Sequence, residues 1–319
     1  MPYLPDSAYK LSHSIFKQAH LSTIYSGAVK RTEIPDYRRS KLNLPDGDFI
    51  LMDEVFKDSK RAVILCHGLE GNSQSSYNNT CADYFLQHDF SVFAWNNRSC
   101  GGEMNNLPQL YHHGSVEDLD FVVKYVMQKD FEEIYLMGFS LGGAQILNYL
   151  GQKPVHQKVK AAVAVSTPID LKSSAEKIEK GFSRVYLNRF LKRIKNKIYH
   201  KAEEFPDLLK REHINEIRNF DDLAERFLVP VHGFKNPADF YKKASPVTHL
   251  DYIRTPVLVL NAMDDPIIGD LGFPIQFAKQ SPYLFLETPR YGGHCGFLLS
   301  QSNYTFSEVR ALEFFKDIL

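Results

Sequence analysis

The chain has 319 residues, with 38 Lys or Arg against 38 Asp or Glu and a formal net charge of +0. Its 44% hydrophobic and 24% charged residues are those of an ordinary globular protein. The charge balance argues against proteins that bind nucleic acid or acidic partners through overall charge, so we expect no nucleic-acid partner. No apolar run approaches the roughly 18 residues of a membrane-spanning helix, so we expect no transmembrane segment.

Cysteine usage and the N-terminus indicate a reducing compartment. Cys66, Cys81, Cys100 and Cys295 form no CxxC pair, and a domain of this size needs no disulfide staples. Residues 1–20 have neither a sustained apolar core nor a small-residue cleavage site, which argues against a secretory signal. We therefore predict a cytoplasmic protein with reduced thiols.

In chain order, short apolar runs alternate with segments of helical period. Residues 41–44 and 49–53 flank the turn sequence Pro45-Asp46-Gly47-Asp48, which predicts an antiparallel hairpin at a sheet edge. Nearly all-apolar runs predict doubly buried strands over 62–66, 90–95, 134–137, 161–165, 257–260 and 284–286. Helical periodicity predicts helices over 75–87, 116–127, 141–150, 271–280 and 307–318. The alternation favours an α/β fold with a mostly parallel central sheet and helices on both faces.

The alternation stops between Ser166 and Thr255, where we find no convincing strand. We interpret residues 166–255 as a helical lid inserted into a core of residues 1–165 and 256–319. Loops at the carboxyl ends of parallel strands build the site in such folds, so an insertion there is expected to cover it.

The segment Gly138-Phe139-Ser140-Leu141-Gly142 matches G-x-S-x-G. A predicted strand leads into it and a predicted helix leads out, which is the setting of a strained nucleophile turn. The glycines remove side chains that would collide with neighbouring backbone in so tight a turn. The alternative is a glycine-rich packing turn with a solvated serine. We favour Ser140 as a nucleophile.

A serine hydroxyl needs a general base, and the base needs a carboxylate that fixes its tautomer. His294 follows the last predicted strand between glycines, although one of 12 histidines can also be an ordinary loop residue. Asp264 and Asp265 both follow the preceding strand, and we favour Asp265 as the acid, with Asp264 as a turn residue. The chain order Ser140, Asp265, His294 is that of α/β-hydrolases.

Acyl transfer also needs two preorganised donors for the oxyanion. The backbone N–H of Leu141 is one candidate, because it follows the nucleophile at a helix start. The loop Cys66-His67-Gly68-Leu69-Glu70 supplies the N–H of Leu69 as the other, unless it is only a turn with a structural histidine.

Two other polar groups receive structural interpretations. We expect Arg98, which follows a strand, to bind carbonyls or a carboxylate behind the site. The side chains that could bind a metal have neither the helical spacing nor the CxxC spacing of metal ligands. We therefore expect neither a metal nor a cofactor. The side chains weighed for a metal are His67, His112, His113, His294, Cys66, Cys100 and Cys295.

Several strings together resemble the YheT-like branch of the α/β-hydrolases over most of the chain. They are His20-Leu21-Ser22-Thr23, Leu44-Pro45-Asp46-Gly47-Asp48-Phe49, His67-Gly68-Leu69-Glu70-Gly71, Asn97-Arg98-Ser99-Cys100-Gly101-Gly102, Tyr111-His112-His113-Gly114, Glu117-Asp118, Gly138-Phe139-Ser140-Leu141-Gly142-Gly143, Asn261-Ala262-Met263-Asp264-Asp265-Pro266 and Gly292-Gly293-His294-Cys295-Gly296-Phe297. The departures are Ser99, where the family usually has glycine, and Ser22, where it commonly has glutamine. Neither is an inferred triad residue.

The resemblance implies carboxylic-ester hydrolysis through an α/β-hydrolase fold. Family members have been linked to monoacylglycerol, phospholipid and short-chain acyl esters, and some transfer acyl groups to alcohols. The resemblance therefore implies a serine esterase acting on a small-molecule, acyl or lipid-like ester. Two alternatives stay open: an acyltransferase to an alcohol, and a non-catalytic binding protein on the same fold.

Residues 180–201 hold eight Lys or Arg and no acid, with apolar residues at helical spacing. This pattern is typical of a basic amphipathic helix. One interpretation is peripheral contact with an anionic membrane surface. The other, which we favour, is a lid helix packed on the core with a solvated basic face.

Overall fold

Strands and helices alternate along the computed structural model, which describes residues 3–5, 7–29 and 33–318. The predicted core range also includes residues 1, 2, 6, 30–32 and 319, which lie outside the described residues. The strands are β1 (Tyr3–Leu4), β2 (Arg38–Asn43), β3 (Phe49–Val55), β4 (Arg61–Cys66), β5 (Ser91–Asn96), β6 (Glu133–Phe139), β7 (Val159–Val165), β8 (Val257–Leu260) and β9 (Leu284–Glu287). The α-helices are α1 (Ala19–Ile24), α2 (Ser76–Leu86), α3 (Val116–Met127), α4 (Leu141–Gln152), α5 (Leu171–Ile178), α6 (Arg184–Glu204), α7 (Arg211–Glu216), α8 (Phe220–Leu223), α9 (Val229–His232), α10 (Pro237–Ala244), α11 (Ile275–Gln280) and α12 (Phe306–Ile318).

Among the described residues the strands form one sheet in the order β1-β9-β8-β7-β6-β4-β5-β3-β2. Every neighbouring pair from β5 to β1 is parallel. The predicted mostly parallel sheet is therefore confirmed. The predicted edge hairpin is also confirmed, because β2 and β3 pair antiparallel around the 45–48 turn. Strand β1 was not predicted, since two residues are too short to show an alternating pattern.

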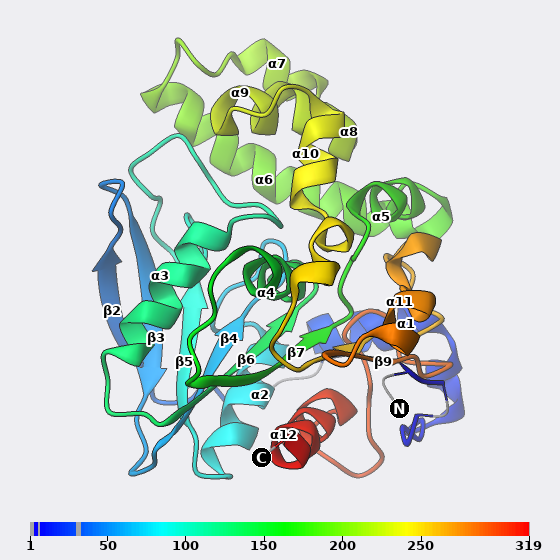
Figure 1. The fold of residues 1–319 in the computed structure, drawn as a ribbon. Coiled ribbons are helices and arrows are strands. Elements are labelled where there is room, and N and C mark those ends of the chain that lie inside the picture. The colour runs from blue at the N-terminus through cyan, green and yellow to red at the C-terminus, as the bar shows by residue number, and fades with distance from the viewer. Residues whose placement is uncertain (1–2, 6, 30–32, 319) are drawn as a thin grey trace.

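Helices cover both faces of the sheet, which explains why the strands are nearly all-apolar. In β4, Ile64 packs in the cluster that includes α3 and α4, whereas Val63 and Leu65 pack in the cluster that includes α2 and α12. Figure 1 shows α3 and α4 on one side of the sheet and α2 and α12 on the other. The point where β6 ends and α4 begins thus lies in the middle of the sheet, with packed helices on both faces.

Residues 166–255 connect β7 to β8 through helices α5 to α10, and the described chain forms no strand between Val165 and Val257. Figure 1 shows α6 to α10 gathered over one end of the sheet domain. We call residues 166–255 the helical cap. Its buried apolar side chains, including Leu187, Phe227 and Phe240, form a cluster with Leu141 at the start of α4. The cap therefore packs directly over the turn that carries Ser140.

One predicted helix is wrong in its first half. The prediction was a single helix over 271–280, whereas the structure has a 3-10 turn at Asp270–Gly272 and α11 only from Ile275. Pro274 separates the two pieces. A residue before proline is displaced from the helical region, and Phe273 accordingly has φ −121° and ψ 83°.

Candidate active site

Ser140 lies in a strained turn between β6 and α4. Its φ of 54° and ψ of −116° are unusual for a residue with a side chain. The turn is fixed because the Ser140 amide donates to the carbonyl of Val165 on β7, at 2.8 Å. Strain of this kind persists only where the surrounding structure enforces it, and it is often found at functional sites.

Glycines allow the turn that carries Ser140 to approach its neighbours. A Cβ atom at Gly138 would lie 2.5 Å from the backbone carbon of Gly142. A Cβ atom at Gly142 would lie 2.2 Å from the carbonyl oxygen of Cys66, at the end of β4. Both glycines are therefore required by close backbone contact.

His294 and Asp265 form a buried pair. The Nδ1 atom of His294 lies 2.8 Å from Asp265 Oδ2, and the aspartate side chain is fully buried. The other carboxylate oxygen accepts from the amides of Ile267, at 2.8 Å, and Ile268, at 3.2 Å. These bonds hold the carboxylate, and the carboxylate leaves the Nε2 edge of the imidazole available.

Asp264 faces the backbone of the histidine loop rather than the imidazole. Its Oδ1 accepts from the amide of Gly293 at 2.9 Å, and its Oδ2 is buried with no partner among the described residues. Burial, together with the charge of Asp265, raises the pKa of Asp264 to about 6. Asp264 thus supports the loop that carries His294.

Ser140 and His294 line the same cavity, which encloses about 950 Å³ of atom-free space including its mouth. Leu69 and Leu141 line it as well. Most of the remaining wall is apolar and comes from the cap: Leu171, Ala175, Ile178, Phe190, Ile194, Phe220, Leu223, Phe227, Leu228, Phe240 and Tyr241. Such a space suits an apolar group attached to a polar reacting centre.

His67 fixes the peptide that carries the Leu69 amide. The Asn97 amide donates to His67 Nε2 at 3.0 Å, so the proton of the neutral ring is on Nδ1. That Nδ1 lies 2.7 Å from the carbonyl of Gly68, which also accepts from the amide of Gly71 at 3.0 Å. Burial lowers the pKa of His67 to about 4, which keeps the ring neutral.

Because a trans peptide is planar, its N–H points away from its C=O. Fixing the Gly68 carbonyl therefore fixes the direction of the Leu69 N–H, for which the described residues provide no acceptor. Leu141 is the first residue of α4, where backbone amides have no partner within the helix. The structure brings both candidate residues, Leu69 and Leu141, to the cavity that Ser140 lines.

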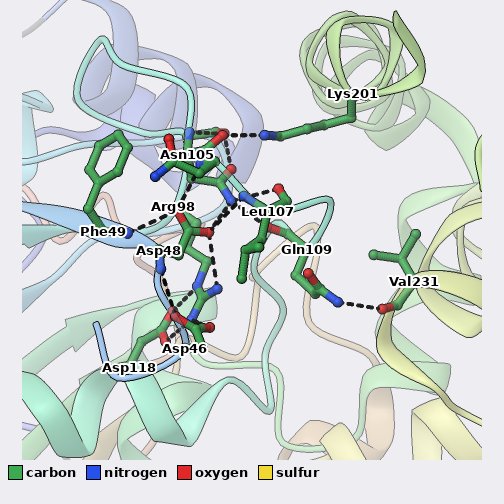
Figure 2. Close-up of polar contacts among 12 residues, drawn as sticks. Asp46, Asp48, Phe49, Arg98, Asn105, Leu107, Gln109, Asp118, Lys201 and Val231 are labelled. Atoms are coloured by element: carbon green, nitrogen blue, oxygen red, sulfur yellow. Dashed lines mark hydrogen bonds and ion pairs between the residues drawn. The ribbon is translucent and has the colours of Figure 1, made fainter. Parts of the chain in front are cut away.

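Arg98 pairs with carboxylates behind the site, as predicted. Its guanidinium donates to both oxygens of Asp118, at 2.8 and 2.7 Å, and to Asp48 at 3.2 Å. Figure 2 shows Asp48 at the centre of this network, between Arg98 and Asn105. The network joins the 45–48 turn to α3 and to the 98–110 loop.

Two residues near the site were missed by sequence reasoning. Thr23 Oγ1 accepts from the amide of His294 at 2.9 Å, across 271 positions in the chain. Ser166 Oγ accepts from the amide of Cys295 at 2.8 Å. Neither side chain has a local pattern that announces such a partner, although Thr23 belongs to one of the strings that carry the family resemblance.

No metal centre or disulfide accompanies the candidate catalytic residues within the described part of the chain. In residues 3–5, 7–29 and 33–318, no group of three or more His, Cys, Asp or Glu side chains has a metal-binding arrangement. The four cysteines are free thiols. No helix in these ranges combines the length and the apolar character that crossing a bilayer requires.

Comparison with known proteins identifies the family. The sequence profile of the family described as alpha/beta hydrolase fold matches residues 61–301. A monoacylglycerol lipase of Saccharomyces cerevisiae (strain ATCC 204508 / S288c) is 33% identical over 274 residues, which cover 82% of this chain and 60% of that protein. The YheT protein of Escherichia coli (strain K12) is 29% identical over 294 residues, covering 89% of this chain and 85% of that protein.

The fold is shared more widely than the sequence. An esterase of Pyrococcus furiosus superimposes with a TM-score of 0.57 at 17% identity, covering 88% of this chain and 91% of that one. The chain spans 60% of the length of the yeast relative, so it matches only part of that protein. The match to the family profile covers the sheet from β4 onward and the whole cap. The chain is a member of the α/β-hydrolase family, in its YheT-like branch.

Proposed function

We propose that this chain is a serine carboxylic-ester hydrolase that acts on acyl or lipid-like esters through an acyl-enzyme. The observation that carries the proposal is that Ser140, on its strained turn, and His294, held by Asp265, line one apolar cavity. The similarity to a monoacylglycerol lipase supports an ester of this class.

In the proposed acylation step, Ser140 Oγ attacks the ester carbonyl carbon and His294 Nε2 accepts the hydroxyl proton. The carbonyl oxygen becomes an oxyanion that accepts from the amides of Leu69 and Leu141. The intermediate then collapses, the C–O bond to the alcohol breaks, and His294 returns its proton to the leaving alcohol. Asp265 stabilises the transient imidazolium without taking its proton.

In the second step, water attacks the acyl-enzyme with His294 as general base, and the fatty or other carboxylic acid is released. An alcohol in place of water gives a new ester instead, which is the acyltransferase alternative. The apolar wall around Ser140 favours an alcohol with an alkyl chain as a competing acceptor. Adding ethanol and measuring ethyl ester against free acid distinguishes the two outcomes.

The experiment that tests the proposed function is hydrolysis of p-nitrophenyl esters from acetate to palmitate. We expect turnover by the wild type, with a preference for a chain longer than acetate because each buried methylene contributes about 0.8 kcal/mol. Ser140→Ala is expected to abolish it. A folded wild type that releases no nitrophenol from any ester indicates a binding protein instead.

Membrane contact through residues 180–201 is a secondary proposal. Because most apolar side chains of this helix are buried, we propose that only the start of the segment meets the membrane. The apolar side chains Leu187, Leu191, Ile194 and Ile198 pack inside the cap. Only the start of the segment offers exposed apolar side chains, with Phe182 52% and Val185 54% exposed. We expect sedimentation with anionic liposomes to fall when both are changed to serine. Unchanged sedimentation, or none by the wild type, contradicts membrane contact.

The proposed chemistry uses only side chains and backbone amides of this chain, so it needs no cofactor. The cytoplasmic location stays a prediction, and four free thiols are consistent with it. A lid function for residues 166–255 is likewise proposed, because many of their side chains line the cavity together with Ser140.

A further inference from the structure

Three cations of helix α6 contact the core of the protein, although the Arg193 side chain stays exposed whereas Lys197 and Lys201 are largely buried. Arg193, Lys197 and Lys201 are four residues apart and so lie on one face of the helix. Arg193 Nη1 donates to the carbonyl of Glu70 at 3.0 Å, and Lys197 Nζ to Glu70 Oε1 at 2.8 Å. Lys201 Nζ donates to the carbonyl of Asn105, as Figure 2 shows. The predicted solvated basic face is thus, in this stripe, a set of contacts between cap and core.

The amide, the carbonyl and one carboxylate oxygen of Glu70 each have a hydrogen-bond partner. Its amide donates to the hydroxyl of Tyr111 at 2.7 Å, and that hydroxyl lies 2.8 Å from Glu70 Oε1. Its carbonyl and its carboxylate accept from Arg193 and Lys197. The Glu70 side chain is 3% exposed and the Lys197 side chain 17% exposed, so water screens this ion pair weakly.

The backbone of Glu70 has φ of 57°, in the left-handed region that disfavours a residue with a side chain. Its surrounding contacts must stabilise this conformation. Because Glu70 directly follows Leu69, the bond from the Glu70 amide to Tyr111 fixes the orientation of the peptide after Leu69. The peptide before Leu69 is fixed by the two bonds to the Gly68 carbonyl.

We propose that Lys197 is a positioning residue for ester hydrolysis: from the cap, through Glu70, it holds the Leu69 amide in place as an oxyanion donor. This inference rests on the proposed function. Its consequence is that the cap takes part in catalysis only when it is docked, because one of the contacts that order the oxyanion loop comes from α6.

Removing the Lys197 charge leaves the buried carboxylate of Glu70 with Tyr111 as its remaining side-chain partner. An uncompensated buried charge is costly, so the carboxylate is expected to turn toward water and release the left-handed conformation. The peptide after Leu69 then loses its fixed orientation, and the Leu69 amide is held from one side only, by the bonds to the Gly68 carbonyl. Loss of an oxyanion donor lowers kcat by roughly 100- to 1,000-fold, and a misdirected donor by about 10-fold or more.

The test compares Lys197→Met with three variants of the same helix. Lys197→Arg keeps the charge. Lys192→Met removes the charge of an exposed lysine on the outer surface of α6. Lys201→Met removes a contact between cap and core that does not involve Glu70. For each we propose to measure kcat and KM with p-nitrophenyl butyrate. The inhibition constant of an alkyl trifluoromethyl ketone, whose serine adduct carries an oxyanion, is the second readout.

For Lys197→Met we expect kcat to fall about 10-fold or more with KM changed less than about 3-fold, since the amide acts in the transition state. The ketone should bind weaker by the same factor. Lys197→Arg should recover most of the loss, and Lys192→Met should match the wild type. Lys201→Met should keep ketone affinity to within about 3-fold, even if its melting temperature falls.

Three results overturn the inference. The first is a Lys197→Met variant whose kcat matches that of Lys192→Met, and the second is an effect of Lys197→Met on KM alone. The third is an equal loss of ketone affinity in Lys197→Met and Lys201→Met. If Lys197→Met does not fold, Glu70→Gln tests the same contact, because it keeps the side-chain size and removes the charge. Glu70→Gln with full kcat and full ketone affinity is then the contradicting result. An inactive wild type instead contradicts the proposed function itself.

Discussion

Neutralising Asp265 distinguishes the two neighbouring carboxylates. Asp265→Asn keeps an oxygen for the amides of Ile267 and Ile268 and presents an NH₂ group to His294 Nδ1. Two donors then face each other at a distance of 2.8 Å, so the imidazole must move its proton to Nε2. A ring with its proton on Nε2 cannot accept the proton of Ser140.

The expected loss follows from that wrong tautomer. Mutation of the equivalent carboxylate in a serine triad lowers kcat by about 10⁴-fold, which corresponds to about 5.4 kcal/mol of transition-state stabilisation. The neighbouring change, Asp264→Asn, keeps the acceptor for the Gly293 amide and leaves the imidazole pair intact. We expect it to lower kcat by less than about 10-fold.

The assay is kcat/KM for p-nitrophenyl butyrate at pH 8, with folding checked by circular dichroism. We expect Asp265→Asn to lose at least about 10³-fold and Asp264→Asn to stay close to the wild type. Equal losses, or the larger loss in Asp264→Asn, would refute the assignment of Asp265 as the acid.

Three further predictions concern stability and specificity. Gly142→Ala pushes a methyl group against the Cys66 carbonyl, so the free energy of unfolding in urea should fall by about 2 kcal/mol or more. Gly27→Ala is the control, because its methyl group meets open space and should lower this free energy much less. Asp264 has a pKa raised to about 6, so ionising it costs stability as the pH rises from about 4 through 6. Asp264→Asn should therefore raise the melting temperature at pH 8, by the equivalent of about 1 kcal/mol for this partly exposed group, and by nothing at pH 4. Ala175→Trp places a large side chain in the cavity. It should lower the ratio of kcat/KM for p-nitrophenyl octanoate to that for p-nitrophenyl acetate by about 10-fold or more. An unchanged ratio would contradict binding of the acyl chain in this cavity.

Local patterns were sufficient to predict the sheet and the turn that carries Ser140. Strands buried on both faces are nearly all-apolar. A glycine stands on each side of the serine because a Cβ atom there would lie only 2.2 or 2.5 Å from neighbouring backbone atoms. Two features were not predicted: the pairing of β1 with β9 at the sheet edge, and the helix break at Pro274. Both depend on segments too short to show a clear pattern.

The environment of the site depends on contacts between distant parts of the chain. Sequence alone left Asp264 and Asp265 as competitors, because two adjacent side chains differ only in which atoms they meet. The contact between Lys197 and Glu70 could not be predicted for a similar reason. A basic, amphipathic pattern does not specify which cations face solvent and which face Glu70, 127 positions away.

The measurement that tests the central proposal most directly is labelling by a fluorophosphonate probe, followed by peptide mass mapping. An activated serine displaces fluoride from the probe and keeps the phosphonyl group, whereas an ordinary serine does not react. We expect one adduct on Ser140 in the wild type, and none on this residue after His294→Ala. A folded wild type that stays unlabelled, or an adduct on a different serine, would contradict Ser140 as the nucleophile.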